Sequence, residues 1–318
     1  MNQDLLTVGL AQISPVWLNR EATLAKVVGM IAEAKSHAVD LIAFGEALVP
    51  GYPFWPELTD GARFNAPDQK VLYALYVDQA IDIAAGHLDE VCVAAKESGV
   101  ALYLGIIEKS LERGQSLYCS MVYIDAEGQI GSVHRKLTPT YEERLNWSPG
   151  DGHGLRVHSL GAFTVGGLNC WENWMPLPRA ALYGQGEDLH VAIWPGGYRN
   201  THDITRYLAK EGRSFVMSVG GLMRSEDFPS DTPYYDEIMA GCSEDFLADG
   251  GSCLSGPDGE WLIEPQCGQE GLYVATIDHA NVREERQNFS PAGHYSRPDV
   301  TKLIVNRERQ STVKFTGD

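Results

Sequence analysis

The 318-residue chain lacks the segments that mark membrane, secreted and nucleic-acid-binding proteins. Its apolar runs fall short of the roughly 18 residues that a membrane-spanning helix needs. The N-terminal segment MNQDLLTVGLAQISPVW has no basic stretch followed by an apolar one, as a secretory signal peptide requires. Basic residues are scarce, with 25 Lys and Arg against 43 Asp and Glu and a formal net charge of −18. Because this charge repels phosphate backbones and anionic lipid, we expect neither a nucleic-acid nor a membrane partner.

Paired cysteines and metal-binding motifs are also missing. The nine histidines form no HExxH or mixed Cys/His spacing, and no CxxC pair occurs. The six cysteines are scattered along the chain: Cys92, Cys119, Cys170, Cys242, Cys253 and Cys267. Scattered thiols are typical of a reduced cytoplasmic protein and not of a disulfide framework. We therefore predict a cytoplasmic protein with no metal site, and 318 residues suffice to bury a core without disulfides.

What the chain does contain is an alternation of strand-like and helix-like segments. Apolar, β-branched runs predict strands at 5–13, 39–45, 100–107, 117–124, 163–169, 189–194, 215–219 and 272–277. A hairpin is predicted from 253–254 and 261–263 around Pro257-Asp258-Gly259. One helix face is predicted from Leu24, Val27, Val28 and Ile31, and a second from Ile81, Ala84, Ala85, Leu88, Val91 and Ala95.

Strands separated by helices favour an α/β layered fold. No Pro/Gly/Ser-rich linker divides the chain, so we predict a single domain, and the number of strands suggests two packed sheets. Two irregular segments, residues 52–70 and 224–240, carry prolines, aromatics and acids without periodicity. Long irregular segments in compact domains are often functional or interfacial, although ordinary loops explain them equally well.

Cys170 is the first candidate for chemistry. It ends the strand-like run AFTVGGLNC and is followed by WENWMPLPR, so we expect a strand that delivers the thiol to a turn, with a helix beyond the prolines. Backbone N–H groups at such a turn can favour a thiolate and later stabilise an oxyanion. An arbitrary cytosolic cysteine is more often a buried structural one. The glycines at 166 and 167 and the polar Trp-Glu-Asn that follows distinguish Cys170 from that background.

Glu46 and Lys136 also follow strand-like runs. Glu46 lies in VDLIAFGEALVPGYPFW, where apolar neighbours argue against an exposed loop acid, and a buried carboxylate needs a partner. Lys136 lies in VHRKLTPTYEERLNW, where a basic triplet alone would indicate only a solvated strand end.

Together the three segments resemble the nitrilase superfamily, whose catalytic Glu, Lys and Cys occur in this chain order. The matches are Glu46 in FGEALVPGYPFW, Lys136 in HRKLTPTYEERLNW and Cys170 in GGLNCWENWMPLPR. The likeness runs from about residue 5 to residue 300 and includes AGHYSRPDV near the end, with His294 and Arg297. Gly45 departs from the pattern, since many relatives have proline before the glutamate, and the tail after residue 309 is short.

The resemblance implies a cofactor-free hydrolase with a four-layer α-β-β-α sandwich of two packed mixed sheets. In this reading a single carbon–nitrogen hydrolase domain spans residues 1–318, with a C-terminal oligomerisation tail from about residue 280. Cys170 would attack a nitrile carbon to give a thioimidate and then a thioester, with carboxylic acid and ammonia as products. Glu46 would be the general base, and Lys136 with a backbone N–H near Trp171 would stabilise negative charge. Glu143 matches a second glutamate of the family motif that orients substrate or Lys136.

Several alternatives stay open at this stage. The Trp-Glu-Asn after Cys170 resembles true nitrilases, whereas related aliphatic amidases usually have Tyr and Asp there. An amidase or carbamoylase, a hydratase that stops at the amide, and a non-catalytic oligomeric scaffold are the rivals. Arylaceto-, aliphatic and aromatic nitriles are all possible substrates. Aromatic residues near the motifs could line an apolar pocket or belong to the core: Tyr52, Phe54, Trp55, Trp171 and Trp194.

The resemblance also implies a homo-oligomer larger than a dimer. Dimers would form through helices, one of them after Cys170, and the two irregular segments fall where nitrilases carry insertions that join dimers into a spiral or filament. Aromatics in these segments could be the contact residues: Tyr52, Phe54, Trp55, Phe64, Phe228, Tyr234 and Tyr235. The −18 charge opposes association at low salt.

Overall fold

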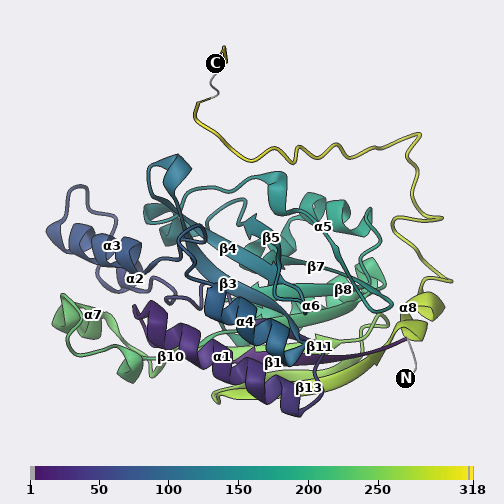
Figure 1. The fold of residues 1–318 in the computed structure, drawn as a ribbon, viewed down its shortest axis with the longest axis horizontal. Coiled ribbons are helices and arrows are strands. Elements are labelled where there is room, and N and C mark those ends of the chain that lie inside the picture. Colours follow the sequence, from purple (N-terminus) through teal and green to yellow (C-terminus); the bar gives the residue numbers. More distant parts are fainter. Residues whose placement is uncertain (1–3, 314–315, 318) are drawn as a thin grey trace.

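The computed structural model describes residues 4–313, 316 and 317, and its architecture is a sandwich of two sheets between helical layers (Figure 1). The first sheet is mixed, with β1, β2 and β3 parallel. Its strands in spatial order are β13 (Gly271–Asp278), β1 (Leu5–Gln12), β2 (Leu41–Phe44), β3 (Ala101–Ser110), β4 (Ser116–Ile124) and β5 (Ile130–Arg135).

The second sheet is mixed as well, with β7, β8 and β9 parallel at its centre. Its strands in spatial order are β10 (Leu222–Arg224), β11 (Phe246–Ser255), β9 (Phe215–Gly220), β8 (Leu189–Trp194), β7 (Phe163–Asn169) and β6 (His158–Leu160). The predicted hairpin is present, since β12 (Trp261–Cys267) pairs antiparallel with β11. Two packed mixed sheets confirm the predicted fold class.

Strand alternation builds the two main cores. On β3, Leu102 and Leu104 face the helices that cover the first sheet, while Ala101 and Tyr103 face the second sheet. Because successive side chains of a strand point to opposite faces, each sheet contributes one apolar layer to the interface between the sheets and another to its helices. Both faces of the sheets are therefore buried, which explains the continuous apolar runs of the sequence.

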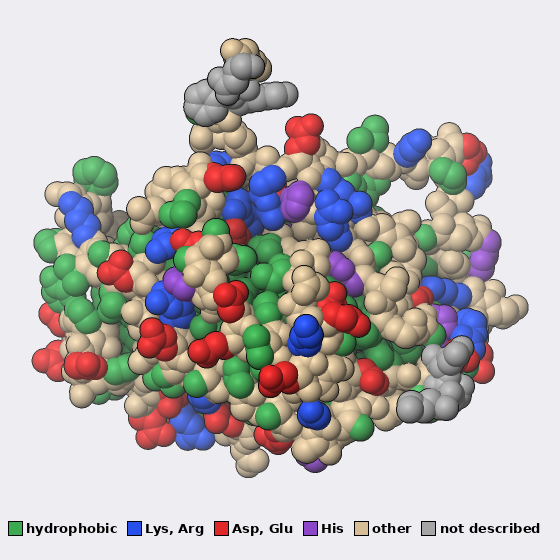
Figure 2. Space-filling view, in the orientation of Figure 1, with side chains coloured by type: hydrophobic (Ala, Val, Ile, Leu, Met, Phe, Trp, Pro, Cys, Tyr) green, Lys and Arg blue, Asp and Glu red, His purple; other side chains and the backbone are tan. Residues whose placement is uncertain are grey.

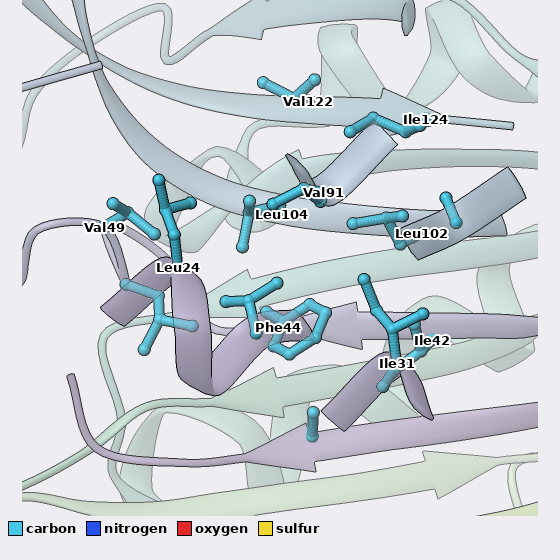
Figure 3. Packing of buried hydrophobic residues seen from close by; sticks show 14 of the residues in the cluster. Leu24, Ile31, Ile42, Phe44, Val49, Val91, Leu102, Leu104, Val122 and Ile124 are labelled. Carbon is cyan, nitrogen blue, oxygen red and sulfur yellow. The ribbon is translucent and has the colours of Figure 1, made fainter. Parts of the chain in front are cut away.

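The outer layers are helical. On the first sheet lie α1 (Arg20–Ser36) and α4 (Asp89–Ser98), and on the second lie α5 (Pro176–Tyr183) and α6 (Tyr198–Gly212). Figure 3 shows Leu24 and Ile31 of α1 packed with Val91 of α4 over the first sheet. The side chain of Asn19 accepts a hydrogen bond from the Ala22 N–H (3.0 Å) and so begins α1. Four layers in the order α-β-β-α result.

The second predicted helix is correct only in its last part. Ile81 is extended and bridges to Glu108 of β3, and the following residues form turns before α4 begins at Asp89. Two local features interrupt helical geometry here. The Asp82 carboxylate accepts the Ala85 N–H (3.1 Å), and Gly86 has a φ of 82°, in the left-handed region. The apolar spacing from residue 81 to 85 therefore reflects packing of an extended segment and a turn.

The two irregular segments lie together at one end of the molecule, where they form α2 (Trp55–Leu58) and α7 (Tyr235–Gly241), with α3 (Pro67–Gln79) beside them (Figure 1). Trp55 is fully buried and Phe228 is 3% exposed, packed edge-on against Trp17 (4.6 Å between ring centroids). These two aromatics belong to the protomer's own core, so their interpretation as contact residues is wrong. Phe64 by contrast is fully exposed, and Figure 2 shows apolar side chains gathered at this end.

The chain ends in a long arc. After α8 (His279–Glu285), residues 287–304 are mostly exposed and irregular, and they arch away from the body (Figures 1 and 2). Residues 314, 315 and 318 of the predicted tail lie outside the described residues. In the part of the chain that is described, every helix is too short or too polar to cross a membrane. The six cysteines are free thiols.

Candidate active site

Three loops that follow strand ends converge between the two sheets. Glu46 follows β2 and Lys136 follows β5, both in the first sheet, whereas Cys170 follows β7 in the second. Lys136 Nζ lies 2.9 Å from Glu46 Oε1 and 2.7 Å from Glu143 Oε2. One oxygen of each carboxylate and Cys170 Sγ all lie within 4.8 Å of one another. We call these four residues the catalytic cluster; each is at most 3% exposed.

Cys170 occupies a strained turn. It begins a short 3₁₀ helix, η4 (Cys170–Trp174), directly after β7, and its φ of 46° lies in the left-handed region that non-glycine residues rarely adopt. The Asn173 side-chain amide donates to the Cys170 carbonyl (2.8 Å) and helps to hold this conformation. Burial and the nearby Glu46 raise the pKa of the Cys170 thiol, while Lys136 and the Trp171 N–H act in the opposite direction. The thiol is therefore protonated at rest, and its thiolate is favoured by a cation and an N–H group.

Glu46 is a buried carboxylate with unused hydrogen-bonding capacity. Its Oε1 accepts from Lys136 and from the Cys119 thiol (3.4 Å), but its Oε2 has no hydrogen-bond partner among the described residues. Burial raises the pKa of Glu46 to about 7, against the attraction of Lys136. A carboxyl group that titrates near neutrality and has a free oxygen is suited to exchanging protons.

The backbone around Glu46 explains the departure at Gly45. The Glu46 N–H donates to the Trp194 carbonyl of β8 (3.0 Å), which ties the Glu46 loop to the second sheet. A Cβ atom on Gly45 would lie 2.7 Å from the backbone nitrogen of Gly221. Any larger residue at position 45 would therefore require the backbones to separate, and glycine lets the two sheets meet at this point.

Lys136 is the charge at the centre of the cluster. Burial alone would lower its pKa, but Cys170 in its thiolate form, Glu46 and Glu143 raise it well above its usual value. Its ammonium group lies 5.4 Å from the centroid of the Trp147 ring. Lys136 therefore stays protonated and supplies the site with a fixed positive charge.

Glu143 is held by more contacts than Glu46. It lies in η2 (Tyr141–Leu145), where its Oε2 accepts the Thr140 N–H (2.6 Å) in a capping box as well as Lys136. Its Oε1 accepts the Tyr52 hydroxyl (2.9 Å). Burial and the Glu143 charge raise the pKa of Tyr52 well above its usual value, so Tyr52 remains a hydrogen-bond donor. The structure thus brings Glu143 and Tyr52, both predicted as supporting residues, into direct contact with the cluster.

The two tryptophans predicted as supporting residues differ in exposure, and neither indole contacts the polar atoms of the cluster in the interactions described below. The Trp171 indole is half exposed and stacks on Trp174, so only its backbone N–H faces the thiol. The Trp194 side chain is fully buried in the apolar cluster that includes Cys170, and its Nε1 donates to Ser218 (3.3 Å). Trp194 contacts the site through packing and through its carbonyl at Glu46.

Sequence reasoning missed Glu172 as a site residue. This buried carboxylate accepts the N–H of Asn169 (2.9 Å) on the Cys170 side and the N–H of Leu137 (2.7 Å) on the Lys136 side, and it pairs with His134 (3.0 Å). Burial opposes its ionisation, but His134 and the two N–H groups lower its pKa. Glu172 therefore joins the two loops that carry Cys170 and Lys136. The Asn-x-x-Glu spacing from residue 169 is a helix-start signal that could have indicated it.

A second buried network supports the Cys170 turn from behind. The Asn173 oxygen accepts from His190 Nε2 (2.7 Å), and His190 Nδ1 lies 3.0 Å from Glu187. All three side chains are buried. No sequence motif links them, because they come from η4, β8 and the loop before it.

Charge argues against a metal ion in the cluster. Glu46, Glu143 and Cys170 present three ligand-type atoms close together, a spacing that could hold a cation. Lys136 Nζ already lies within 2.9 Å of both carboxylates. A metal ion would meet this ammonium at short range, and the repulsion would be severe in a buried site.

An open cavity of about 760 Å³ is lined by residues of the segments 54–58, 196–199 and 241–249, and none of the four cluster residues lines it. Phe54 on its wall packs against Tyr52 (4.9 Å between ring centroids), and Gly196 on its wall follows Trp194 closely in sequence. Apolar residues of the lining are Phe54, Leu58, Phe246, Leu247 and Ala248, and charged ones are Glu57, Arg199, Glu244 and Asp249. The cavity is large enough for a small organic molecule.

Comparisons with known proteins agree with this geometry. The family described as Carbon-nitrogen hydrolase matches residues 7–287. "Nitrilase 2" of an unknown prokaryotic organism is 37% identical over 98% of this chain and 95% of its own length. A bifunctional nitrilase/nitrile hydratase of Nicotiana tabacum is 32% identical over 97% of this chain and 88% of its own.

Two solved structures share the fold at low sequence identity. A carbon-nitrogen hydrolase of Helicobacter pylori G27 superposes with a TM-score of 0.70 at 17% identity, over 94% of this chain and 100% of its own. A mutant of an amidase from Nesterenkonia sp. AN1, with acrylamide added at its active-site cysteine, gives a TM-score of 0.65 at 17% identity, over 89% and 97%. With the near full-length match to relatives above 30% identity, these findings establish that the chain belongs to the carbon–nitrogen hydrolase family, in its nitrilase branch, and is a hydrolase of carbon–nitrogen bonds.

Proposed function

We propose that the protein hydrolyses an organic nitrile to the carboxylic acid and ammonia through a covalent intermediate on Cys170. The observation that carries this proposal is the catalytic cluster itself, in which a buried thiol lies within 4.8 Å of two carboxylates joined by one lysine. The curated relatives are named as nitrilases, and several of them also as nitrile hydratases.

The reaction begins with transfer of the Cys170 proton to Glu46. A nitrile carbon is a weak electrophile and needs a soft, strong nucleophile, which the thiolate provides. As the C–S bond forms, the nitrile nitrogen gains negative charge and takes the proton from Glu46, giving the thioimidate R–C(=NH)–S–Cys170 and an ionised Glu46. The Lys136 ammonium and the Trp171 N–H lie where they can stabilise this charge, and their fixed positions favour the transition state.

Two waters complete the reaction. Glu46 activates the first, which adds to the thioimidate carbon to give a tetrahedral intermediate, and loss of ammonia from it leaves a thioester. The second water cleaves the thioester, releases the acid and restores the Cys170 thiol. Glu143, fixed by Lys136, Tyr52 and Thr140, orients the lysine and the substrate. All the groups used are side chains and backbone of this chain, so the mechanism calls for no cofactor.

Two rivals differ in substrate or product. An amidase would accept amides with the same cluster, and an amidase is among the proteins that share the fold. A hydratase would break the C–S bond of the tetrahedral intermediate before ammonia leaves and release the amide. Incubation with arylaceto-, aliphatic and aromatic nitriles and their amides, with assays for ammonia, acid and amide, separates the three. We expect acid and ammonia from nitriles; amide as the sole product supports the hydratase, and turnover of amides alone supports the amidase.

We further propose that the protein works as a cytoplasmic homo-oligomer built from dimers, extended into a spiral or short filament. The exposed Phe64, at the end formed by α2, α3 and α7, supports this proposal as a contact residue, and the predicted Tyr234 and Tyr235 nearby are partly exposed. Light scattering after size exclusion across a salt series tests this proposal. We expect the mass to exceed a dimer and to grow with salt as the −18 charge is screened. Phe64→Glu should reduce the mass, and a monomeric wild type at all salts would contradict the proposal.

A further inference from the structure

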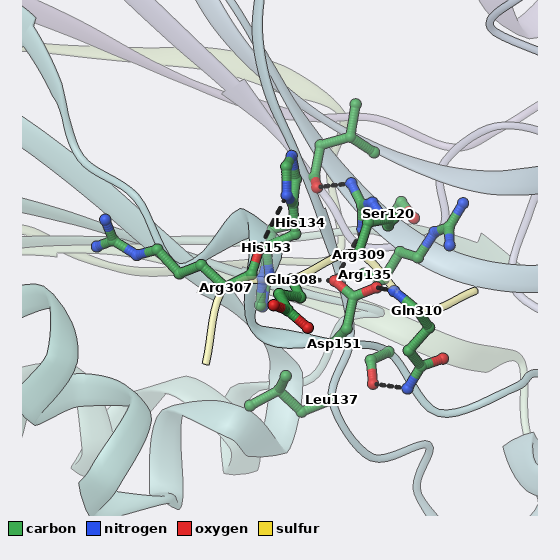
Figure 4. A network of polar contacts seen from close by, with 12 residues as sticks. Ser120, His134, Arg135, Leu137, Asp151, His153, Arg307, Glu308, Arg309 and Gln310 are labelled. Carbon is green, nitrogen blue, oxygen red and sulfur yellow. Dashed lines mark hydrogen bonds and ion pairs between the residues drawn. The ribbon is translucent and has the colours of Figure 1, made fainter. Parts of the chain in front are cut away.

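The end of the described chain returns onto the body. After the exposed arc, residues 305–310, here called the returning segment, lie against the loop that follows Lys136 (Figure 4). Val305 packs on an apolar cluster that includes Leu168 and Leu182. His153 Nδ1 lies 3.1 Å from the Arg307 carbonyl. The chain is therefore anchored again about twenty residues after α8 ends.

A buried carboxylate recognises this segment. Asp151 is 7% exposed, and both its oxygens bind the returning segment. Arg309 Nη1 donates to Oδ1 (3.0 Å), and the Gln310 N–H donates to Oδ2 (2.9 Å). With the segment docked, Asp151 is buried, and its charge is compensated by Arg309, by the Gln310 N–H and by the His153 N–H (3.1 Å to Oδ1), whereas a buried charge without partners is strongly unfavourable. The docking is therefore specific for this sequence.

Gly152 lines the surface on which the returning segment docks. A Cβ atom at this position would collide with the carbonyl oxygen of Asn306. Its φ is not in the left-handed region, so the glycine serves the close approach of the segment and not the local turn. Alanine at position 152 would thus displace the segment without changing any charge.

The docked segment is connected to the Lys136 loop and to the strand that leads to Cys170. Gln310 Nε2 donates to the Gly150 carbonyl (2.9 Å), and the Gly150 N–H donates to the Lys136 carbonyl (2.8 Å). Arg309 Nη2 donates to the carbonyl of Val133 on β5, three residues before Lys136. Leu168, under Val305, lies two residues before Cys170. The segment thus spans the strand ends that carry the cation and the nucleophile.

We propose that the returning segment is a positioning element of the active site. Docked, it holds the backbone of Lys136 and the strand leading to Cys170 in their working positions. Undocked, it leaves a folded protein whose Lys136 is displaced and whose turnover is low. This inference rests on the proposed function for its activity readout, and it concerns residues that contact no reacting atom. The residues that dock beside Asp151 and Gly152 are residues 305–310 of the same chain.

The test compares two arginines of the same segment in the full chain. Arg309→Met removes the contacts to Asp151 and Val133, whereas Arg307→Met removes an equal charge from a side chain that forms no ion pair among the described residues. We expect Arg309→Met to lower kcat on the order of 10- to 100-fold with KM changed less than about twofold, because small displacements of catalytic groups have effects of this size. Arg307→Met should match wild type.

A readout independent of nitrile turnover is the rate at which iodoacetamide alkylates Cys170. Peptide mass mapping follows this rate, with the exposed Cys267 as internal reference. A displaced Lys136 favours the thiolate less, so alkylation of Cys170 should slow in Arg309→Met and in Gly152→Ala but not in Arg307→Met. If the wild type hydrolyses no nitrile, the proposed function fails, but these rates still decide whether the segment positions Lys136.

Rescue in trans completes the experiment. A synthetic peptide of residues 302–313 should restore kcat and alkylation rate to Arg309→Met, and the same peptide with methionine in place of Arg309 should not. Equal effects of the two arginine variants, or a lower melting temperature with unchanged kcat and alkylation, would overturn the proposal. Loss of wild-type kcat on dilution would assign the docked segment to a second copy and overturn the within-chain assignment.

Discussion

Arg135 and Lys136 are neighbours in sequence and both are buried. The charge of Arg135 is fully paired with one carboxylate, whereas Lys136 is shared between two carboxylates. Arg135 forms a two-pronged pair with Glu108 (Nε–Oε2 2.9 Å, Nη2–Oε1 2.5 Å), and Glu108 Oε2 also accepts the Ser120 hydroxyl. The Arg135 guanidinium further packs over the Tyr118 ring at 4.1 Å. Lys136 faces two carboxylates and a thiol, and one oxygen of Glu46 lacks a hydrogen-bond partner among the described residues.

The difference separates a structural ion pair from one that we propose to be reactive. The Arg135–Glu108 pair satisfies its charges with each other, so no proton needs to move. The catalytic cluster holds one cation for two carboxylates and a thiol. A proton can therefore reside on the thiol or on a carboxylate. Charges that are saturated contribute to the fold, whereas charges that are left incompletely paired can do chemistry. Four predictions test this contrast.

The largest effect is expected at the nucleophile. Cys170→Ala should lower kcat by more than about 10⁴-fold, since removal of a nucleophile has effects of this order, with little change in melting temperature. Intact-mass and peptide analysis of the wild type with a slow nitrile should find the adduct on the Cys170 peptide. An adduct on Cys119, whose thiol also contacts Glu46, would contradict the assignment.

The next effect concerns Glu46 and Lys136 as a unit. Glu46→Gln and Lys136→Met should each lower kcat by about 10³-fold, because Glu46 accepts the thiol proton and the Lys136 charge holds Glu46 ionised for that transfer. The double variant should be little worse than either single one, since residues that act together are not additive. Strictly multiplicative losses, or an active Glu46→Gln, would show that the two act independently.

A smaller effect is expected from pH. Glu46 must be ionised to accept the thiol proton, so with a pKa of about 7, kcat/KM should fall about tenfold for each unit below pH 7.

The contribution of Glu46 to the free energy of unfolding should change with pH in the opposite direction. The folded state binds the Glu46 proton more tightly than the unfolded state, so the contribution of Glu46 to stability is greatest below pH 4.5 and is lost as pH rises toward 7. In Glu46→Gln the stability trend should weaken, and a trend unchanged by this substitution would assign the titration to another group.

The smallest effect on activity is expected at the saturated pair. Glu108→Gln leaves Arg135 buried without a counter-charge and should lower the free energy of unfolding by about 3 kcal/mol, the usual cost of breaking a buried pair. Per folded molecule, kcat should change less than about twofold. Urea unfolding and kinetics on the same preparation measure both quantities. A loss of kcat as large as that of Lys136→Met would remove the distinction between the two pairs.

Much of this molecule can be predicted from its sequence where a local pattern determines the outcome. The strands at 39–45, 163–169 and 189–194 are recognisable because they are short, largely apolar runs that are buried on both faces. The residues of the cluster were recognisable because each lies in a long motif. The helix α6 was missed although it has a clear apolar face, which includes Ile204 and Leu208, because charged residues separate its apolar positions.

Other features depend on tertiary contacts that no local pattern encodes. The pairing of Glu172 with His134, the Asn173–His190 bond and the burial of Trp55 and Phe228 each join segments far apart in the chain or fix the exposure of a loop. The role of Gly45 is of the same kind, since only the approach of Gly221 makes a side chain there impossible. Residues that look alike in sequence, such as Arg135 and Lys136, are distinguished only by what the rest of the chain places beside them.

The catalytic cluster is divided between two sheets, and this has a consequence for the newly made protein. Glu46, Lys136 and Glu143 come from the half that contains the first sheet, and Cys170 comes from the second, so a chain with only one sheet formed carries an ordinary, unactivated cysteine. Chemical competence thus appears together with closure of the sandwich and not before it. Turnover can therefore serve as an assay of sheet docking during refolding, and its onset should coincide with burial of the interface between the sheets.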